Sequence, residues 1–476
     1  MKDKKTGLYI HIPFCVRKCN YCAFLSFDAE TSPRREYADA LVNEIRIRAK
    51  QLGHPRIDTI YAGGGTPSVL DIAQMRNIMH AVKTSFEVSP DAEITIEANP
   101  GTLGRKDGVT LAKLQAYRFM GFNRISMGVQ SMDNSRLHFM GRIHTAENVA
   151  RDMELIRRKG FSNVNLDLIF SVPGSSTQDS LEDLERILAL RPEHISCYSL
   201  QIEEGTPFAR MAESGEISEV SDEDDRRTYH KICRMLKEAG YEHYEISNFA
   251  RMDHAEADVI APGFETECCS EGNILKTYRF ADASAKAGTY TNTNKNTDTR
   301  KSICETTGNS TGKDIDAKSR YRSKHNSLYW DMSDYIGLGL GASGFVSGVR
   351  YKNTSDIEEY IENFDPMRSS DGEHFRFPLE EEHLNTSFDN ISEAVFTGLR
   401  RREGITYEEA VSSFRCGRDS VGIAEPAKTE FWRIFAEAKA EAEEYAKRGL
   451  LIIDEKGLRL TEQGIDISNS IMSMFV

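Results

Sequence analysis

The first 250 residues alternate short strand-like runs with longer helix-like runs, and this order constrains the fold more than any other feature of the chain. Each strand-like run is rich in β-branched or aromatic residues and is bounded by Gly, Pro, Asn or Asp. The predicted strands are residues 7–12, 58–62, 93–98, 124–129, 164–170 and 195–201. Strands joined by helices form a parallel sheet with right-handed crossovers. Six such units predict an α/β fold, an open (β/α)6 barrel.

Helical patterns fill the intervals between these strands. The first has Ser32 as its expected N-cap and Pro33 at its first helical position, and Gly53 ends it. The later ones cover residues 70–84, 107–120, 145–159, 177–190 and 222–239, the last followed by a strand-like YEHYEIS. In the related eight-fold TIM barrel, ligands bind at loops that follow strands. A motif directly after a predicted strand is therefore a strong candidate site.

The chain divides into four predicted parts. Residues 1–250 form the core barrel, and residues 251–320, which are polar and poor in large aliphatic side chains, form a flexible insertion. Structure returns to the core over 321–366. The last part, 367–476, has helical patterns at 390–401, 406–415 and 427–448, a hairpin in LLIIDEKGLRLT and a final helix. It predicts a winged-helix-like α+β accessory domain that serves packing or docking.

Composition excludes several classes of protein. With 60 basic and 74 acidic residues the net charge is −14, which argues against a general nucleic-acid binder. No run approaches the roughly 18 apolar residues of a membrane span, and the start, MKDKKTGLYIHIPF, lacks a signal-peptide pattern. A cytoplasmic, reducing location is therefore expected. The nine cysteines are accordingly not a disulfide framework.

Three of these cysteines, Cys15, Cys19 and Cys22, have the spacing CxxxCxxC in the loop after the first predicted strand. A structural zinc site would need a fourth ligand, and His11 stays open for that role. Three buried thiols are the plainer alternative. A [4Fe–4S] cluster explains the number better, because three thiolates hold three irons and leave the fourth iron open to a small molecule.

CxxxCxxC with Tyr21 before the last cysteine resembles the signature of the radical S-adenosylmethionine (radical SAM) superfamily. In that superfamily the fourth iron is chelated by S-adenosylmethionine, and one electron from the cluster cleaves this cosubstrate to a 5′-deoxyadenosyl radical. The resemblance implies that Cys15, Cys19 and Cys22 are the metal ligands here. It also implies that the cosubstrate occupies the coordination site that the protein leaves open.

Further motifs stand at or near the ends of the following predicted strands. YIHIPFC, AGGGTPS, IEANP, GVQS and DLIFSVPG together resemble the coproporphyrinogen-III-oxidase-like branch of this superfamily, over residues 1–250 and again over 321–476. Polar groups at successive strand ends could meet the hydroxyl and carboxylate groups of one nucleoside. The resemblance assigns cosubstrate contacts to Tyr9, Tyr21, Gly64, Gly65, Thr66, Glu97, Gln130, Arg142 and Asp167.

That branch contains two activities. The oxygen-independent coproporphyrinogen III dehydrogenases carry CxxxCxxCxC, whereas this chain has Phe24 at the fourth cysteine position. The HemW-like haem chaperones lack that cysteine and carry HNxxYW, which matches the stretch from His325 to Tyr329 and Trp330. Flat aromatic rings suit a porphyrin and histidine can ligate its iron. The alternative is that Tyr329 and Trp330 are core aromatic residues and that His325 is a cap at the surface.

The resemblance implies haem binding and delivery to acceptor haem proteins, among them membrane respiratory enzymes, and leaves a homodimer open. Three alternatives remain: the dehydrogenase reaction in porphyrin biosynthesis, a zinc-stabilised interaction module, or radical chemistry on an unrelated substrate. Gly339–Gly344 also fits GxGxxG, the dinucleotide-binding fingerprint. That fingerprint needs a helix to follow, but FVSGVRYKN predicts a strand or turn, so nucleotide binding there is not expected.

Overall fold

The computed structural model describes residues 5–252, 318–365, 375–415 and 426–476. Most of the predicted 251–320 insertion, with Cys268, Cys269 and Cys304, and also Cys416 lie outside these ranges. No helix within the described ranges is long and apolar enough to cross a membrane.

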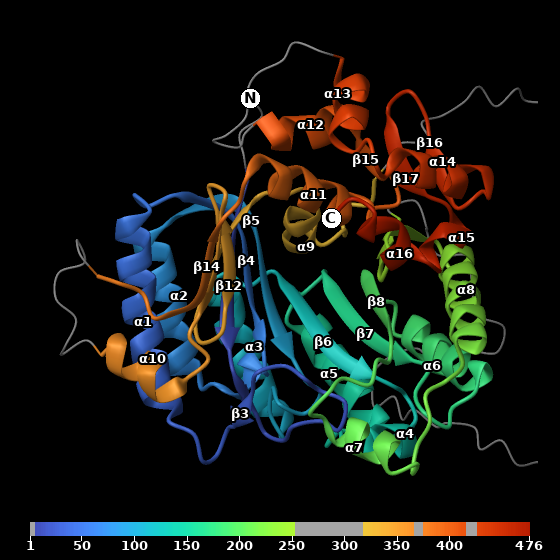
Figure 1. The fold of residues 1–476 in the computed structure, drawn as a ribbon. Coiled ribbons are helices and arrows are strands. Elements are labelled where there is room, and N and C mark those ends of the chain that lie inside the picture. Colours follow the sequence, from blue (N-terminus) through green and yellow to red (C-terminus); the bar gives the residue numbers. More distant parts are fainter. Residues whose placement is uncertain (1–4, 253–317, 366–374, 416–425) are drawn as a thin grey trace, which may run out of the picture. The chain divides into compact units, whose positions relative to one another are not determined.

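One twelve-stranded sheet organises the described chain, in the order β14-β13-β12-β11-β1-β4-β5-β6-β7-β8-β10-β9 (Figure 1). Its central strands are β1 (Thr6–Ile12), β4 (Arg56–Gly64), β5 (Glu87–Ala98), β6 (Arg124–Gln130), β7 (Val164–Phe170) and β8 (His194–Ser199). These six pair in parallel with their neighbours, and the sheet does not close on itself. The predicted α/β class and open barrel are therefore confirmed.

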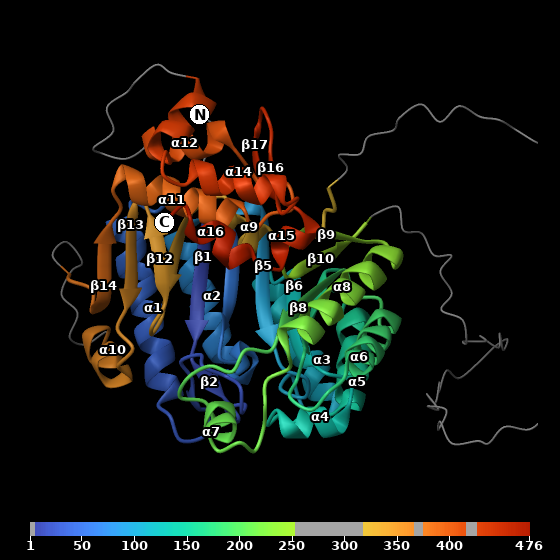
Figure 2. The ribbon, with the colours of Figure 1, turned by 45° about the vertical axis from the view of Figure 1, so that its right-hand side comes forward.

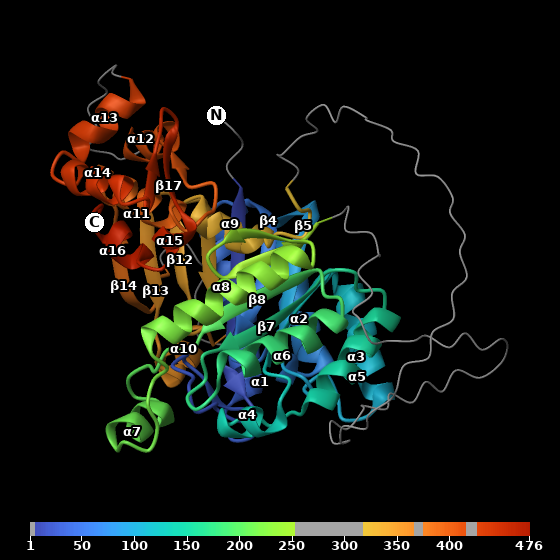
Figure 3. The same cartoon turned by 90° about the vertical axis from the view of Figure 1, so that its right-hand side faces the viewer.

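Helices between these strands follow the predicted ranges closely. They are α1 (Arg34–Gln51), α2 (Ile72–Ser85), α3 (Asp107–Met120), α5 (Ala146–Arg158), α6 (Thr177–Ala189) and α8 (Asp222–Glu238). Along this row α1 packs on α2, α2 on α3, α3 on α5 and α6 on α8, and Figure 3 shows several of them side by side on the outer face of the strands. The N-cap of α1 is Pro33 rather than Ser32, and no side chain among the described residues caps it.

Both edges of the sheet are extended by strands that the six-unit pattern does not contain. On one side lie β11 (Asp334–Leu338), parallel to β1, and the antiparallel β12 (Ser343–Val346), β13 (Val349–Asn353) and β14 (Leu379–Leu384). On the other side lie β10 (Asn248–Arg251) and β9 (Tyr241–Glu245). The chain from residue 334 thus returns to pair with its own first strand.

Glu44 on α1 joins this extension to the barrel. Its fully buried carboxyl group accepts hydrogen bonds from the Gly339 N–H (2.7 Å), the Tyr360 hydroxyl (2.6 Å) and the Asn353 amide (2.8 Å). Burial raises the pKa of Glu44, and the Arg48 guanidinium is the first of several groups that oppose this rise. Three donors from distant segments therefore depend on one side chain.

The C-terminal part consists of short helices and a three-stranded sheet, with β15 (Ile405–Thr406), β17 (Gly457–Leu460) and β16 (Leu451–Ile453) in that order. Its helices are α11 (Ser387–Gly398), α12 (Tyr407–Arg415), α13 (Ala427–Ile434), α14 (Lys439–Lys447), α15 (Glu462–Ile465) and α16 (Ser468–Ser473). The single helix predicted over 427–448 is wrong, because the chain forms two helices there. In Figure 2, α11 and α16 lie at the end of the sheet opposite β2 (Phe14–Cys15), α4 (Asn134–Phe139) and α7 (Pro207–Glu213).

Candidate functional site

The three clustered cysteines lie directly after β1. Cys15 ends β2, which pairs with β3 (Phe27–Asp28), and its Sγ lies 3.5 Å from the Thr66 hydroxyl. Arg142 Nη1 donates to Cys19 Sγ over 3.5 Å. Burial raises the pKa of Cys15 and of Cys22, and the charge of Cys19 adds to the shift in both. The three thiols therefore share one local environment, with a guanidinium placed to stabilise thiolate charge.

The donor set suits a cluster. Within the described part of the chain, no three His, Cys, Asp or Glu side chains converge on a point that could hold a single metal ion. A cubane cluster binds each thiolate through a different iron and does not need that convergence. His11, considered as a fourth ligand, has its Nδ1 2.8 Å from the Tyr9 hydroxyl and its Nε2 3.3 Å from the Leu25 carbonyl oxygen. Both of its ring nitrogens are thus already in contact with polar groups.

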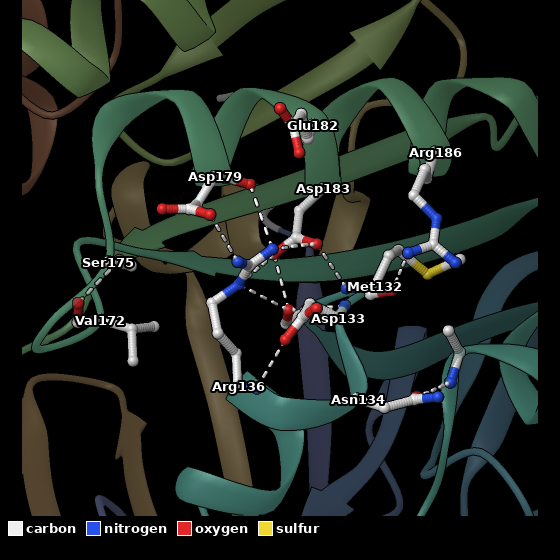
Figure 4. Close-up of polar contacts among 12 residues, drawn as sticks. Met132, Asp133, Asn134, Arg136, Val172, Ser175, Asp179, Glu182, Asp183 and Arg186 are labelled. Carbon is white, nitrogen blue, oxygen red and sulfur yellow. Dashed lines mark hydrogen bonds and ion pairs between the residues drawn. The ribbon is translucent and has the colours of Figure 1, made fainter. Parts of the chain in front are cut away.

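Asn20 ties the cysteine loop to α4 and α7. Its N–H donates to the Met140 carbonyl (3.0 Å), its side-chain amide donates to the Phe139 carbonyl (2.8 Å), and its own carbonyl accepts from the Phe208 N–H (2.9 Å). The connection from β6 to α4 is held in turn by Arg136, which pairs with Asp179 and Asp183 on α6 (Figure 4). The cysteine loop is therefore attached through Asn20 to the end of α4 and to α7.

The glycine loop after β4 lies against the start of the cysteine loop. The Gly65 N–H donates to the Ile12 carbonyl (2.9 Å) and the Thr66 N–H to the Phe14 carbonyl (2.8 Å). Gly64 has φ +110°, and a Cβ there would lie 2.4 Å from Cε1 of His11. Only glycine allows this approach. The loop after β4 is thus held by its backbone N–H groups against the start of the cysteine loop.

Carboxylates and amides occupy the inner face of the next strands. Glu97 accepts hydrogen bonds from the Tyr61 hydroxyl (2.7 Å) and the Gly64 N–H (3.1 Å). Asp167 accepts from the Asn165 amide (2.7 Å). Gln130 ends β6 with φ +70°, and its buried Oε1 has no hydrogen-bond partner within the described ranges. A strained residue with an unpaired buried acceptor indicates a ligand that would donate to it.

Sequence reasoning missed two residues here. Asn99 donates to the Thr66 hydroxyl (2.8 Å) and accepts from Arg142 (2.6 Å), so it joins the glycine loop to the guanidinium. Its position two residues after Glu97, on the same face of an extended chain, is the signal that could have found it. Arg124 is only 2% exposed, and its positive charge acts on both Glu97 and Asp167. Nothing in the sequence distinguishes this arginine from a surface one.

Glu97 makes stability depend on pH. Burial raises the pKa of Glu97 from 4.5 to about 7; the Asp167 carboxylate adds to the rise, while the Tyr61 hydroxyl opposes it. Because this pKa is higher in the folded state, the associated stability is present below pH 4.5 and is lost as the pH rises through about 7.

We therefore expect cluster-free wild type to lose up to about 3 kcal/mol relative to Glu97→Gln between pH 4.5 and 8. The glutamine keeps an oxygen that can accept from Tyr61. Denaturant unfolding at each pH measures the difference, and parallel pH profiles for the two proteins would contradict the expectation.

The HNxxYW residues lie on α9 (Lys324–Trp330), which packs against β1, β4 and β11. His325 is buried, with Nδ1 2.7 Å from the Thr59 hydroxyl and Nε2 2.8 Å from the Tyr329 hydroxyl. Tyr329 and Trp330 line a cavity of about 640 Å³, whereas His325 is not among its lining residues. The GxGxxG stretch forms the turn between β11 and β12, and a strand rather than a helix follows it.

The structure thus brings the predicted site residues together in one region. Tyr9, the cysteines, the glycine loop, Glu97 and Arg142 are linked by direct contacts to one another or to shared neighbours. Burial raises the pKa of Tyr21, and the nearby Arg142 guanidinium opposes this. Their roles toward a cosubstrate remain predictions.

Comparison with known proteins agrees with this geometry. The family model of the radical SAM superfamily matches residues 9–187, and that of the HemN C-terminal domain matches residues 386–467. The protein named heme chaperone HemW of Lactococcus lactis is 28% identical over 100% of this chain and 98% of its own length. The protein with the same name in Mycobacterium tuberculosis H37Rv is 33% identical over 76% of this chain and 75% of its own.

Among solved structures, coproporphyrinogen III oxidase (HemN) from Escherichia coli, described as a radical SAM enzyme, superposes with a TM-score of 0.70. The identity is 21%, over 99% of this chain and 90% of that one, which supports the fold. Sequence and structure together, with the C-terminal domain included, lead to one assignment. The chain belongs to the HemW family of the radical SAM superfamily.

Proposed function

We propose that this protein is a haem chaperone, which binds haem and delivers it to acceptor haem proteins in the cytoplasm or at the membrane surface. Membership of the radical SAM superfamily implies a [4Fe–4S] cluster and S-adenosylmethionine. Cys15, Cys19 and Cys22 would hold the cluster, and the groups around Glu97 and Arg142 would hold the cosubstrate. When bound, the cluster and S-adenosylmethionine would supply one-electron chemistry or would regulate the protein by their presence.

The cavity beside α9 is the observation that carries the proposal. It measures about 640 Å³, within the ordinary range for ligand pockets. Aromatic and apolar side chains dominate its wall: Tyr9, Phe24, Leu25, Tyr329, Trp330, Met332, Tyr335 and Phe345. Flat rings of this kind suit the faces of a porphyrin. Phe24, at the position of the dehydrogenases' fourth cysteine, is 70% exposed and adds apolar surface where that cysteine would bring a thiol.

Polar groups on the cavity wall suit the propionates of haem. Arg350 and Lys352 line it from β13, although each is already paired with a carboxylate, Glu393 or Glu380. The indole Nε1 of Trp330 is buried and has no hydrogen-bond partner among the described residues. An orphaned buried donor costs stability unless a ligand accepts from it. A haem carboxylate could take that bond.

Trp330 should therefore be needed for haem binding. We expect Trp330→Ala to raise the haem dissociation constant at least about tenfold, because it removes both ring contact and the free donor. Anaerobic titration of the cluster-loaded protein with haemin, followed by visible difference spectra, measures this. The matched control is Trp432→Ala, since Trp432 lies on α13 and does not line the cavity.

Equal haemin affinity in Trp330→Ala and Trp432→Ala would show that haem does not bind in this cavity. No saturable haemin binding by the wild type would end the chaperone proposal itself, and radical chemistry on a porphyrinogen would become the leading alternative. Transfer to a haem-free acceptor, seen as a spectrum that moves from donor to acceptor, tests delivery. The cavity therefore yields separate tests for binding and for transfer.

A further inference from the structure

A continuous chain of contacts joins the Glu97 region to the cavity wall. Glu97 accepts from the Tyr61 hydroxyl over 2.7 Å. The Tyr61 ring stacks on the His325 ring, with centroids 5.2 Å apart and planes inclined by 25°. His325 Nε2 then lies 2.8 Å from the Tyr329 hydroxyl, and Tyr329 lines the cavity. Three contacts therefore link Glu97 to the cavity wall, which Tyr9, another predicted cosubstrate contact, lines directly.

Both ring nitrogens of His325, which lies in this series of contacts, already have partners. Its Nδ1 contacts the Thr59 hydroxyl, its Nε2 contacts Tyr329, and its own backbone N–H donates to Glu93 over 3.0 Å. Burial lowers the pKa of His325 to about 3, with the Arg124 charge as the second cause. The ring is therefore neutral at physiological pH, with one donor and one acceptor nitrogen matched to two hydroxyl groups. Binding iron through Nε2 would require it to give up the contact with Tyr329.

We propose that His325 is a positioning residue rather than an iron ligand, and that it couples the two sites by holding Tyr329 in register with Tyr61 and Glu97. This inference rests on the proposed haem-binding function. Tyr329, not His325, presents a face to the haem. Through the contacts of Tyr61, the position of the Tyr329 ring depends on whether Glu97 is ionised.

The direction of the coupling follows from hydrogen-bond strength. Donors from the cosubstrate that meet Glu97 favour its ionised form. A charged acceptor makes the bond from the Tyr61 hydroxyl shorter and stronger. Tyr61 then holds the stacked His325 ring, and with it Tyr329, in a single arrangement. The cosubstrate therefore tightens haem binding, and by linkage haem tightens cosubstrate binding by the same factor.

The decisive experiment is a haemin titration of oxidised, cluster-loaded protein with and without saturating S-adenosylmethionine. In the wild type the cosubstrate should lower the haem dissociation constant at least about fivefold. Tyr61→Phe keeps the ring stack but removes the bond to Glu97. In this variant the haem dissociation constants with and without cosubstrate should be nearly equal. The haem affinity without cosubstrate should stay within about twofold of the wild type. Tyr117→Phe is the control, because Tyr117 lies on α3 and its buried hydroxyl has no hydrogen-bond partner in the part of the chain that the structure describes.

Two substitutions at His325 separate positioning from ligation. His325→Gln places an amide near the Nε2 position and can keep the contact with Tyr329, whereas His325→Asn places it near Nδ1 and keeps only the contact with Thr59. We expect Gln to retain most haem affinity and Asn to lose at least about fivefold, with the same ferric electron paramagnetic resonance signal for both and for wild type.

The outcomes distinguish this inference from the function beneath it. Saturable haem binding that ignores the cosubstrate, or a Tyr61→Phe variant with the full wild-type ratio, overturns the coupling and leaves the chaperone proposal standing. A changed ferric signal in both His325 variants overturns the positioning role and makes His325 an iron ligand. Wild type that binds no haem overturns the proposed function and, with it, the coupling.

Discussion

Replacing Cys19 by alanine is expected to abolish the iron–sulfur cluster. The spacing provides only three thiolates, so the loss of one leaves two ligands for a cluster that needs three from the protein. It also leaves the Arg142 guanidinium, which donates to Cys19 Sγ, without this partner. Iron and acid-labile sulfide after anaerobic reconstitution should fall from about four each per chain to near zero, and the visible charge-transfer absorption should disappear.

Cys233→Ala is the matched control for Cys19→Ala. Cys233 lies on α8, half-buried and outside the CxxxCxxC loop, and burial raises the pKa of its thiol to about 12. Its loss should leave iron and sulfide unchanged. Full iron and sulfide content in Cys19→Ala would refute the ligand assignment. One zinc per chain without sulfide in the wild type would mean that the cysteines form a structural zinc site and not a cluster.

Glu44→Ala should have a large effect on stability. The substitution leaves the Gly339 N–H, the Tyr360 hydroxyl and the Asn353 amide without their common acceptor, and it leaves Arg48 without its buried carboxyl partner. Removing one partner of a buried charged network costs about 3–5 kcal/mol. Urea unfolding of the cluster-free protein should show a loss of this size.

Glu36→Ala provides the comparison on the same helix. Glu36 is exposed in the first turn of α1, and its removal should change stability by no more than about 0.5 kcal/mol. Glu44→Gln should fall between the two, because its amide oxygen can still accept from some of the donors. A loss below about 1 kcal/mol in Glu44→Ala would mean that the three donors find other acceptors.

The core of the fold is readable from the sequence because each central strand is a compact β-branched run between turn residues. The edges are not readable in this way. β11 is the short segment DYIGL, and nothing in it tells that it pairs with β1, more than 300 residues earlier in the chain. Long-range pairing depends on which edge is left open, and that edge exists only once the barrel has formed.

Tertiary packing also overrides local pattern in the C-terminal part. The stretch FWRIFAEAKAEAEEY contains no Gly or Pro, so it predicts one helix. In the structure α13 ends at Ile434, and Phe435 takes φ −100° and ψ 45°. There its ring packs against Phe388, Phe431 and Phe475. Aromatic packing from distant segments therefore decides a break that the local sequence does not encode.

The candidate site shows the same division. The cysteines and the glycine loop are recognisable because their chemistry is tied to spacing along the chain. Arg124 and the partners of His325 are not, because burial and contact with Thr59 or Tyr61 arise only in the folded protein. His325 illustrates this best: the sequence offers it as an iron ligand or a surface cap, and the surface cap is wrong, because the structure buries it against Thr59 and Tyr329.

The pairing of β1 with β11 has a consequence for biosynthesis. Ile10 lies opposite Leu338, so one edge of the first strand has no partner until almost three-quarters of the chain has been made. At roughly 5–20 residues per second this interval lasts about 15–65 s. An open strand edge beside three reactive thiols invites aggregation and oxidation while the ribosome is still at work. The yield of folded protein should therefore be higher when it is expressed at low temperature and under low oxygen.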